Sequence, residues 1–402
     1  MKKKAAWIAL VVVLGALSGS ATEPAETTAP GDALDVRHVK VYYEPGMYGG
    51  WPANFGIWSW GNEILVGFRK GYYKDLGDRH HLDREKPVYS MLARSLDGGE
   101  TWTVEDPGAK GYLLTKGGMG IPRPDVTFPE LKEPEGGIDF THPDFAMTVR
   151  MNDVDAGISR FFFSYDRGHD WEGPFRLPNF GAPGTAGRTD YIVNGKHDCM
   201  LFLTAAKTNA EEGRLLCART TDGGKTWSRV SWIGPEPKGF EIMPASVRLS
   251  ETDILVTARN RQGDRRWISA YLSQDNGETW EKLDDPVEDC GIGNPPAMIQ
   301  LKDGRICLIY GFRGEPYSIR AKLSSDGGRS WSDDYVLRDD GASRDIGYPR
   351  VVQRPDGKVV ALYYFTDSET GPERYIGATL WDPPPPSASP TSPATAAATS
   401  RR

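Results

Sequence analysis

The chain has 402 residues, with 46 glycines, 30 prolines, 12 tryptophans and 11% aromatic residues, and this turn-dense, aromatic composition favours β architecture. It excludes a long coiled coil and a wholly disordered chain. The net charge of −7 arises from interspersed acids and bases, so no basic stripe is available to a nucleic-acid backbone, and we expect no nucleic-acid partner.

The first 21 residues predict a secretory signal peptide. Three lysines at positions 2–4 precede an apolar run from Ala5 to Leu17, and small residues then lead to Ala21, after which we expect cleavage. The alternative is an uncleaved membrane anchor, but the run is shorter than the roughly 20 residues that span a bilayer. We therefore expect a secreted or periplasmic monomer with no membrane contact after cleavage, in which residues 22–35 form a polar linker.

The four cysteines form two sequential pairs, and two states remain open for them. They are Cys199, Cys217, Cys290 and Cys307. In an exported chain they predict one or two disulfides between neighbouring strands, with sequential pairing favoured among three connectivities. Alternatively, all four are free, buried, small apolar residues. No spacing resembles CxxC or a Cys–His zinc motif, and we expect neither a metal nor a cofactor.

An eight-residue pattern, S/T-x-D-x-G-x-T-W, occurs five times along the chain, with Asp170 and Ser330 in place of the Thr in two copies. Its copies begin at Ser95, Ser164, Thr220, Ser273 and Ser324. The Asp carboxylate and the Ser or Thr hydroxyl can accept hydrogen bonds from a turn, glycine supplies a positive φ, and tryptophan packs beneath the loop. The pattern therefore predicts hairpin turns that stabilise the fold. It does not predict catalytic aspartates, because five such turns cannot all face one site.

The segments between these turns predict a six-bladed β-propeller over residues 36–382. Each period holds about four strand-like runs, and successive repeat aspartates lie 51 to 69 residues apart, which suits a propeller blade. After the fifth copy only three strand candidates remain, so the run from Val36 to Tyr43 is expected to complete the sixth blade and close the ring. Seven blades stay possible because residues 108–139 are hard to assign. Residues 383–402, rich in Pro, Ser, Thr and Ala, are expected to be disordered.

With this repeat, residues 45–381 resemble the sialidase (neuraminidase) superfamily, whose propellers carry the same pattern under the name Asp box or BNR repeat. The Asp box also occurs in propellers without enzymatic activity, so activity has to be argued from the site. The resemblance implies an exo-glycosidase that removes a terminal acidic sugar, sialic acid or a similar one, from a glycan.

The resemblance also implies three catalytic residues. Sialidases use an Asp as acid/base and a Tyr nucleophile activated by a Glu, because a phenol with a pKa of about 10 needs a carboxylate to take its proton. Asp83 precedes the first repeat at the spacing of the family's acid/base, and Tyr348 lies in a segment similar to that of the nucleophile. Glu241 is the expected partner of Tyr348, with Glu236 as a rival.

Sialidases hold the substrate carboxylate with three arginines. Arg259 matches the second of these and Arg313 the third, with Arg320 as a competitor, and two such guanidinium groups can bind a carboxylate bidentately. The first blade departs from the family, because residues 51–60 contain no arginine where an F/Y-R-I-P segment is typical. Arg69 is the candidate replacement. A missing charge-assisted contact of about 1.5 to 3 kcal/mol weakens the case for sialic acid itself.

Two other functions stay open. His80 and His81 lie close to Asp83, and Arg188 begins a later blade, so a neutral His and a Tyr beside arginines could catalyse β-elimination at a uronate. This set is also similar to His-dependent exo-enzymes that act on rhamnose linked to glucuronic acid. We assign His81 and Arg188 to substrate binding.

The third function is a glycan-binding propeller without catalytic activity. Trp51, Trp58 and Trp60 would then stack on sugar faces. At their period-two spacing within a strand, at least one face of this set is expected to belong to the blade core.

Overall fold

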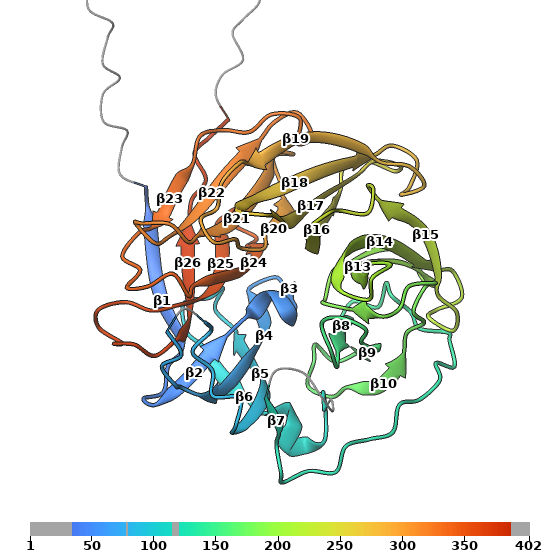
Figure 1. The fold of residues 1–402 in the computed structure, drawn as a ribbon, viewed down its shortest axis with the longest axis horizontal. Helices are drawn as coiled ribbons and strands as arrows, with labels where there is room; N and C mark the ends of the chain where they lie inside the picture. Colours follow the sequence, from blue (N-terminus) through green and yellow to red (C-terminus); the bar gives the residue numbers. More distant parts are fainter. Residues whose placement is uncertain (1–33, 78, 115–119, 387–402) are drawn as a thin grey trace, which may run out of the picture. The chain divides into compact units, whose positions relative to one another are not determined.

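The computed structural model describes residues 34–77, 79–114 and 120–386. These residues form six β-sheets arranged around an axis as the blades of a propeller (Figure 1). The predicted signal peptide, most of the predicted linker and all but the first few residues of the predicted tail lie outside the described residues. None of the helices in the described part of the chain has the length and apolar character needed to cross a membrane.

The first three blades contain the strands from β2 to β15. Blade 1 consists of β2 (Met47–Gly50), β3 (Ile57–Trp60), β4 (Glu63–Tyr72), β5 (Pro87–Ser95), β6 (Thr103–Glu105) and β7 (Ile121–Pro122). Blade 2 consists of β8 (Ala146–Met151), β9 (Ser159–Ser164) and β10 (Glu172–Arg176). Blade 3 consists of β11 (Thr185–Ala186), β12 (Tyr191–Gly195), β13 (Asp198–Ala206), β14 (Glu212–Thr220) and β15 (Ser228–Ile233).

The last three blades have four strands each. Blade 4 consists of β16 (Phe240–Arg248), β17 (Ile254–Gln262), β18 (Arg265–Ser273) and β19 (Glu281–Val287). Blade 5 consists of β20 (Ala297–Gln300), β21 (Ile306–Phe312), β22 (Ser318–Ser324) and β23 (Tyr335–Arg338). Blade 6 consists of β24 (Gly347–Gln353), β25 (Val359–Phe365), β26 (Tyr375–Trp381) and β1 (Val36–Tyr42).

The ring closes through blade 6, in which the first strand of the described chain pairs with the last. β1 runs antiparallel to β26, with Val36 opposite Trp381 and Tyr42 opposite Ile376. On the inner side, β24 contacts β3 and the short 3-10 helix η1 (Pro52–Asn54) of blade 1. The prediction of six blades closed by an N-terminal strand is therefore confirmed.

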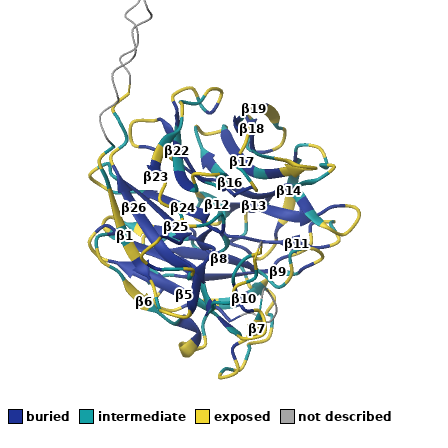
Figure 2. Ribbon diagram, turned by 60° about the vertical axis from the view of Figure 1, so that its left-hand side comes forward, coloured by how far each residue is buried: buried dark blue, intermediate teal, exposed yellow. Residues whose placement is uncertain are grey.

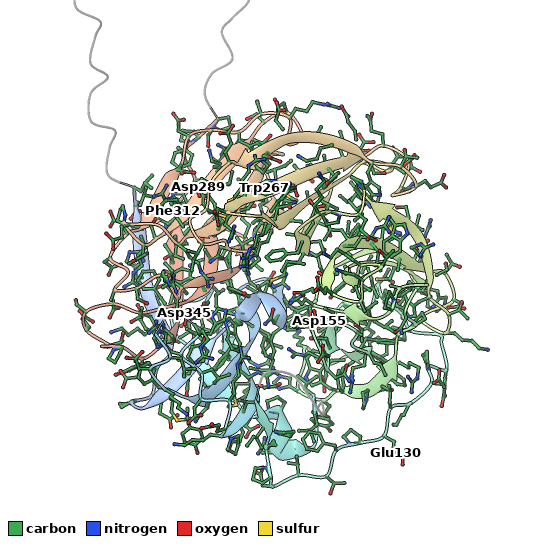
Figure 3. All side chains as sticks on the ribbon, viewed as in Figure 1. Glu130, Asp155, Trp267, Asp289, Phe312 and Asp345 are labelled. Carbon is green, nitrogen blue, oxygen red and sulfur yellow. The ribbon has the colours of Figure 1, made fainter. Side chains whose placement is uncertain are left out.

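The described parts of the segment that left a seventh blade open join existing blades: its start belongs to blade 1, and Lys132 pairs in parallel with Phe175 of β10 in blade 2. The segment contains a second 3-10 helix, η2 (Pro107–Lys110), and the short strand β7, which pairs in parallel with the start of β5. Glu130, farther along this connection, lies at the outer edge of the molecule (Figure 3). This connection therefore adds an extra edge strand to blade 1.

The core lies between the blades, where their faces pack against each other. All seven residues of β25 are buried, as are all seven of β26, because both faces of these strands are covered. Figure 2 shows the strands mostly buried and the connecting loops mostly exposed. These strands are accordingly rich in apolar and aromatic residues, which stabilise the ring by removing their surface from water.

Each repeat forms the turn that leads into the outermost strand of its blade. In the first copy the Asp97 carboxylate accepts hydrogen bonds from Thr101 N–H at 2.9 Å and Ser95 Oγ at 2.8 Å, and Ser95 Oγ accepts from Gly99 N–H at 2.7 Å. Trp102 Nε1 closes the loop by donating to the Gly99 carbonyl at 2.9 Å. The structural role expected for these aspartates agrees with this geometry.

All four cysteines are free and buried, so the disulfide prediction is wrong and the alternative of buried thiols is confirmed. On neighbouring strands β13 and β14, Cys199 lies opposite Thr220 whereas Cys217 lies opposite Phe202. The two cysteines are thus three ladder positions apart, or about 10 Å at strand spacing, which is too far for a disulfide. Cys290 and Cys307 pack in different apolar clusters.

Candidate functional site

A cavity of about 840 Å³ opens at one end of the ring. Its walls come from the β4–β5 connection (residues 74–85), the end of β17, the β21–β22 connection and the segment before β24 (residues 342–345). Among the described lining residues six are basic and four are acidic; the basic ones are Lys74, Arg79, Arg84, Arg259, Arg313 and Arg344. This excess of positive charge favours an anionic ligand.

The cavity and the repeat turns lie at opposite ends of the blades. Arg259 stands near the end of β17, next to the hairpin that leads into β18. Because β18 runs antiparallel to β17, the repeat turn that follows β18 is at the other end of the sheet. The five repeat aspartates are therefore separated from the cavity by the length of a blade.

Tyr348 and Arg259 meet beside this cavity although they come from blades 6 and 4. Arg259 Nη1 donates a hydrogen bond to Tyr348 Oη at 3.0 Å. Arg259 Nε is buried and has no hydrogen-bond partner among the described residues. The guanidinium group therefore keeps hydrogen-bonding capacity for a ligand while it holds the phenol.

The backbone at Tyr348 is strained. Its φ of 48° lies in the left-handed region, which a bulky residue rarely adopts, and it follows Gly347 with a φ of 99°. Asn294 holds this conformation: its Oδ1 accepts from Tyr348 N–H at 2.9 Å and its Nδ2 donates to the Ile346 carbonyl at 2.9 Å. Such strain is typical of residues whose side chain must be aimed for function.

Arg313 is fixed in position by three hydrogen bonds. It donates to the carbonyl groups of Ile346 at 2.8 Å and Gly293 at 3.2 Å, and to Tyr364 Oη at 2.5 Å. Its guanidinium carbon lies 5.2 Å from the centre of the Tyr348 ring. The arginine is only 5% exposed, so it acts as a rigid positive charge in the cavity wall.

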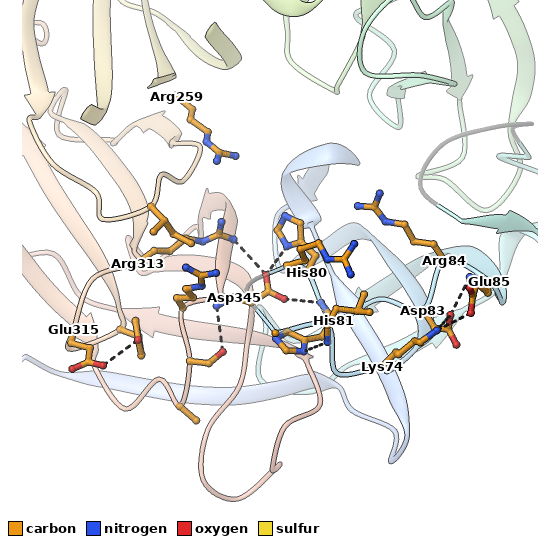
Figure 4. A pocket seen from close by; sticks show the side chains of 18 residues that line it. Lys74, His80, His81, Asp83, Arg84, Glu85, Arg259, Arg313, Glu315 and Asp345 are labelled. Atoms are coloured by element: carbon orange, nitrogen blue, oxygen red, sulfur yellow. Dashed lines mark hydrogen bonds and ion pairs between the residues drawn. The ribbon is translucent and has the colours of Figure 1, made fainter. Parts of the chain in front are cut away.

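A buried pair of His80 and Asp345 lies at the inner end of the cavity (Figure 4). His80 Nδ1 is 2.6 Å from Asp345 Oδ1, and Tyr364 Oη donates to the same oxygen at 2.5 Å. Figure 4 shows His80 and Arg313 pointing toward Asp345 from different elements. With Nδ1 held by the carboxylate, the Nε2 atom of His80 is the one left for a ligand.

The charges around this pair set its protonation. Burial would raise the pKa of Asp345, but His80, Arg374 and Arg313 outweigh burial and hold the pKa of Asp345 well below its usual range. The pKa of His80 is lowered, first by burial and then by Arg313 and Arg259, which together exceed the opposing effect of Asp345. At neutral pH the pair is therefore a neutral imidazole oriented by a carboxylate, which is the state of a general base.

Asp83 also lines the cavity, on the side away from Arg259. Its carboxylate accepts a hydrogen bond from Glu85 N–H at 3.1 Å and lies 3.7 Å from Lys74 Nζ. Figure 4 shows Lys74, Asp83 and Glu85 grouped together, with Arg84 extending away from them. Asp83 is 7% exposed, so it borders the cavity with little contact to bulk water.

A family model described as BNR repeat-like domain matches residues 145–361, more than half of the chain. The chain belongs to this family. The family match and the shared fold confirm the resemblance to BNR-repeat propellers. No curated protein matches the sequence significantly.

Solved structures share this propeller fold at low sequence identity. A protein of unknown function from Dyadobacter fermentans is 21% identical with a TM-score of 0.63, over 86% of this chain and 99% of that one. The NanB sialidase from Streptococcus pneumoniae is 12% identical with a TM-score of 0.54, over 82% and 68%. An α-L-arabinanase from Penicillium chrysogenum, complexed with arabinobiose, is 14% identical with a TM-score of 0.53, over 86% and 97%.

Glu241 does not form the hydrogen bond to the Tyr348 phenol that is expected of a base activating this nucleophile. The carboxylate points into blade 4, where it accepts hydrogen bonds from Asn260 at 2.6 Å, from Tyr271 at 3.1 Å and from Ser269. Among the described residues no hydrogen bond joins Glu241 to Tyr348, and Glu241 does not line the cavity. Burial raises the pKa of Glu241, partly offset by Ser269 and Tyr271. The rival Glu236 instead forms an ion pair with Arg214 at 3.3 Å.

The other two residues predicted to bind substrate, His81 and Arg188, lie in different places in the structure. His81 lines the cavity, where its ring stacks on Tyr73 and its backbone N–H donates to Asp345 Oδ2 at 3.3 Å. Arg188 is buried outside the cavity and forms an ion pair with Glu212 at 2.9 Å. Of the pair, only His81 can reach a ligand in this cavity.

The tryptophans of blade 1 are packing residues in this structure. Trp58 is buried against Trp171, and Trp60 packs in part against the same cluster. Trp51 is 1% exposed and lies beneath His80, with ring centres 5.1 Å apart. Arg320, the competitor of Arg313, instead pairs with Asp334 at 3.0 Å.

Asp345, Tyr364 and Arg374 were not predicted from the sequence. Arg374 donates to the Asp345 carbonyl at 3.0 Å and to Ser343 Oγ at 2.7 Å, which fixes the segment that carries the carboxylate. The one sequence feature that could have indicated Asp345 is its position three residues before Tyr348, in the segment that leads into β24.

Proposed function

We propose that this protein is a glycosidase that removes a terminal acidic sugar from a glycan. The observation that carries the proposal is the hydrogen bond between Arg259 and Tyr348, which sets a carboxylate-binding cation beside a nucleophilic group. The positive excess of the cavity and the glycosidase names of several propellers with this fold support it.

The sugar carboxylate binds to Arg259, opposite the fixed charge of Arg313. Two guanidinium groups match the two oxygens of a carboxylate, and each charge-assisted contact contributes about 1.5 to 3 kcal/mol. In a sialic acid the anomeric carbon itself carries the carboxylate, so this contact brings that carbon toward Tyr348. In a uronic acid the carboxylate is on C5, and the ring oxygen separates C5 from the anomeric carbon. Without a third arginine in the first blade, the site suits a uronic acid as well as a sialic acid.

The first half of the reaction forms a covalent intermediate. Tyr348 Oη attacks the anomeric carbon and its proton passes to His80 Nε2, while Asp83 in its protonated form gives a proton to the departing glycosidic oxygen. Arg259 stabilises the negative charge as it develops on the phenol oxygen. His80 replaces Glu241 here because its ring is 5.9 Å from the Tyr348 ring and its lowered pKa keeps it neutral.

The second half reverses these transfers. A water molecule attacks the anomeric carbon and gives its proton to the Asp83 carboxylate, and the departing Tyr348 oxygen takes its proton back from His80. Because two displacements occur at the same carbon, the anomeric configuration is retained. Asp345 stays ionised throughout and keeps His80 oriented.

The experiment is a panel of oligosaccharides ending in sialic acid or in glucuronic acid, incubated with the full-length protein and analysed by mass spectrometry. We expect one acidic monosaccharide to be released with the gain of one water. Tyr348→Phe should reduce turnover at least a thousandfold at an unchanged melting temperature, whereas Tyr43→Phe, at an exposed position just after β1, should be fully active. Full activity of Tyr348→Phe would refute the assignment of Tyr348 as the nucleophile.

A uronate lyase is the second candidate, and the neutral His80 oriented by Asp345 favours it. In that reaction the arginines neutralise the uronate carboxylate, His80 removes the proton at C5, and the bond to the leaving oxygen at C4 breaks. The product is an unsaturated sugar that absorbs in the ultraviolet, and no water is added. The mass and absorbance of the product therefore separate the two reactions.

We also propose that the protein acts outside the cytoplasm, on the basis of the predicted signal peptide. N-terminal sequencing of protein recovered from the periplasm or the medium of the source cells should begin at Thr22. Recovery of the uncleaved chain from the cytoplasm alone would contradict this.

A further inference from the structure

A second cavity, of about 390 Å³, adjoins the candidate site. Arg84 lines both cavities. Trp51 lines the second cavity while its ring packs edge-on against His80 of the first. The two cavities therefore meet at the Arg84 side chain.

The second cavity is strongly basic. Three of its lining residues are arginines, namely Arg69, Arg84 and Arg150. The only acidic residue among the described lining residues is Asp153, which is exposed and whose Oδ1 accepts a hydrogen bond from Asp155 N–H at 2.9 Å. Among the described lining residues, cationic side chains therefore outnumber carboxylates.

Arg150 is the residue that marks the cavity as a binding site. It is 6% exposed, and none of its three guanidinium nitrogens has a hydrogen-bond partner among the described residues. Its guanidinium carbon lies 4.0 Å from the centre of the Phe55 ring, and that of Arg69 lies 5.4 Å from the same ring. Neither arginine forms an ion pair in the described part of the chain, so two positive charges converge on one aromatic side chain.

Such an arrangement is unfavourable unless an anion completes it. A buried charge without a partner costs several kcal/mol. The pKa of Arg150 is lowered well below its usual value, first by burial and then by Arg69 and Arg350, and burial lowers the pKa of Arg69 to about 10. A bound oxyanion would offset this cost for both guanidinium groups.

Two neighbouring buried arginines, Arg350 and Arg188, have hydrogen-bond partners within the protein, as is expected of arginines with a structural role. Arg350 donates to the carbonyl groups of Ala53 and Thr189, both at 2.5 Å. Arg188 pairs with Glu212 and donates to Asn54 Oδ1 at 3.0 Å. Arg150 has no such partners, which points to a ligand.

We propose that the second cavity binds a sulfate or carboxylate group on the second sugar of the glycan whose terminal acidic sugar occupies the candidate site. The inference rests on the proposed function, and it names the substrate class as a glycan with acidic groups on consecutive sugars. Arg69 and Arg150 present two guanidinium groups to one oxyanion, which is the geometry that sulfate and carboxylate share.

The binding test uses sodium sulfate as the probe, titrated by calorimetry at constant ionic strength with sodium chloride. The measurement is made in an Arg259→Gln background, which weakens anion binding in the candidate site. We expect Arg150→Gln to weaken sulfate binding at least tenfold, and Arg69→Gln to do the same. Arg176→Gln, an exposed arginine of the same blade as Arg150, is the matched control and should bind as its parent. Equal sulfate binding with and without Arg150 would overturn the proposal.

The folding of the variant is checked separately. Removing an unpaired buried charge should leave the melting temperature of Arg150→Gln equal to or above that of the parent. A large drop would mean that Arg150 has a structural role after all, and this result would also overturn the proposal.

The kinetic test compares two uronate-ended disaccharides, with and without a sulfate ester on the second sugar. In the unaltered protein we expect the sulfated substrate to have a KM about 10- to 100-fold lower, and Arg150→Gln to abolish this preference. An equal KM for both substrates, together with Arg150-dependent sulfate binding, would mean that the cavity takes a free anion and would overturn the glycan assignment. Failure of the proposed function would look different: no acidic glycan would be cleaved, while sulfate binding would still depend on Arg150.

Discussion

The Asp345 carboxylate is expected to be essential for stability as well as for the orientation of His80. It is 5% exposed, and it lies 3.5 Å from Arg374 and 3.8 Å from Arg313, which are buried themselves. Asp345→Asn keeps the size of the side chain and removes its charge, so both arginines lose their buried counter-charge. Breaking a buried pair in this way costs about 3 to 5 kcal/mol of the free energy of unfolding.

The assay is guanidinium chloride unfolding at pH 7, with the midpoint and the slope both recorded. Asp284→Asn is the matched control, because Asp284 is exposed on β19, and its free energy of unfolding should change by no more than about 0.5 kcal/mol. Loss of the charge should also lower kcat, since His80 loses its orienting partner.

The difference in the free energy of unfolding between the parent and Asp345→Asn should also depend on pH, and this dependence is a second readout. The pKa of Asp345 in the folded protein is held below its value in the unfolded chain, which is about 3.9. The stabilisation is therefore fully present above about pH 4 and is lost as the pH falls, because the unfolded state takes up a proton first. The difference in the free energy of unfolding between the parent and Asp345→Asn should shrink as the pH falls below about 4. A gap below about 1 kcal/mol at pH 7, or one that does not change with pH, would refute this account of the arginine cluster.

Three further predictions follow from the described contacts. Asp97→Ala removes the acceptor of a repeat turn and should lower the free energy of unfolding by about 1 to 3 kcal/mol at unchanged kcat; equal losses of activity and stability would contradict its structural role. The four buried cysteines should react with Ellman's reagent only after unfolding, and a reducing agent should not change the melting temperature. Because the pKa of His80 is lowered from 6.5, a reaction that needs its neutral form should lose rate only below pH 6.5, and an acid limb above pH 7 would contradict its role as base.

The fold could be predicted because its signals are local and repeated. Each repeat turn is specified by residues within eight positions, and the short count of strands in the last period was enough to assign Val36–Tyr42 to blade 6. The cysteines could not be assigned, because whether two strand residues can be bridged depends on the register between β13 and β14, which spacing along the chain does not give.

The candidate site could be predicted only in part. The segments around Arg259, Arg313 and Tyr348 have family motifs, and the structure brings all three together. The direction in which Glu241 points depends on its hydrogen bonds inside blade 4, and the pair of His80 and Asp345 joins positions 265 residues apart. Such pairings arise from ring closure, and no local pattern indicates them.

The pairing of β1 with β26 has a mechanical consequence. The start of β1, Val36, lies opposite the end of β26, Trp381, so a force that pulls on these two positions acts on one end of the ladder. Its hydrogen bonds would then break one after another, as in a zipper, and would not share the load. Blade 6 is therefore expected to resist heat far better than tension, and tethering at these positions should open the ring at low force before any other blade unfolds.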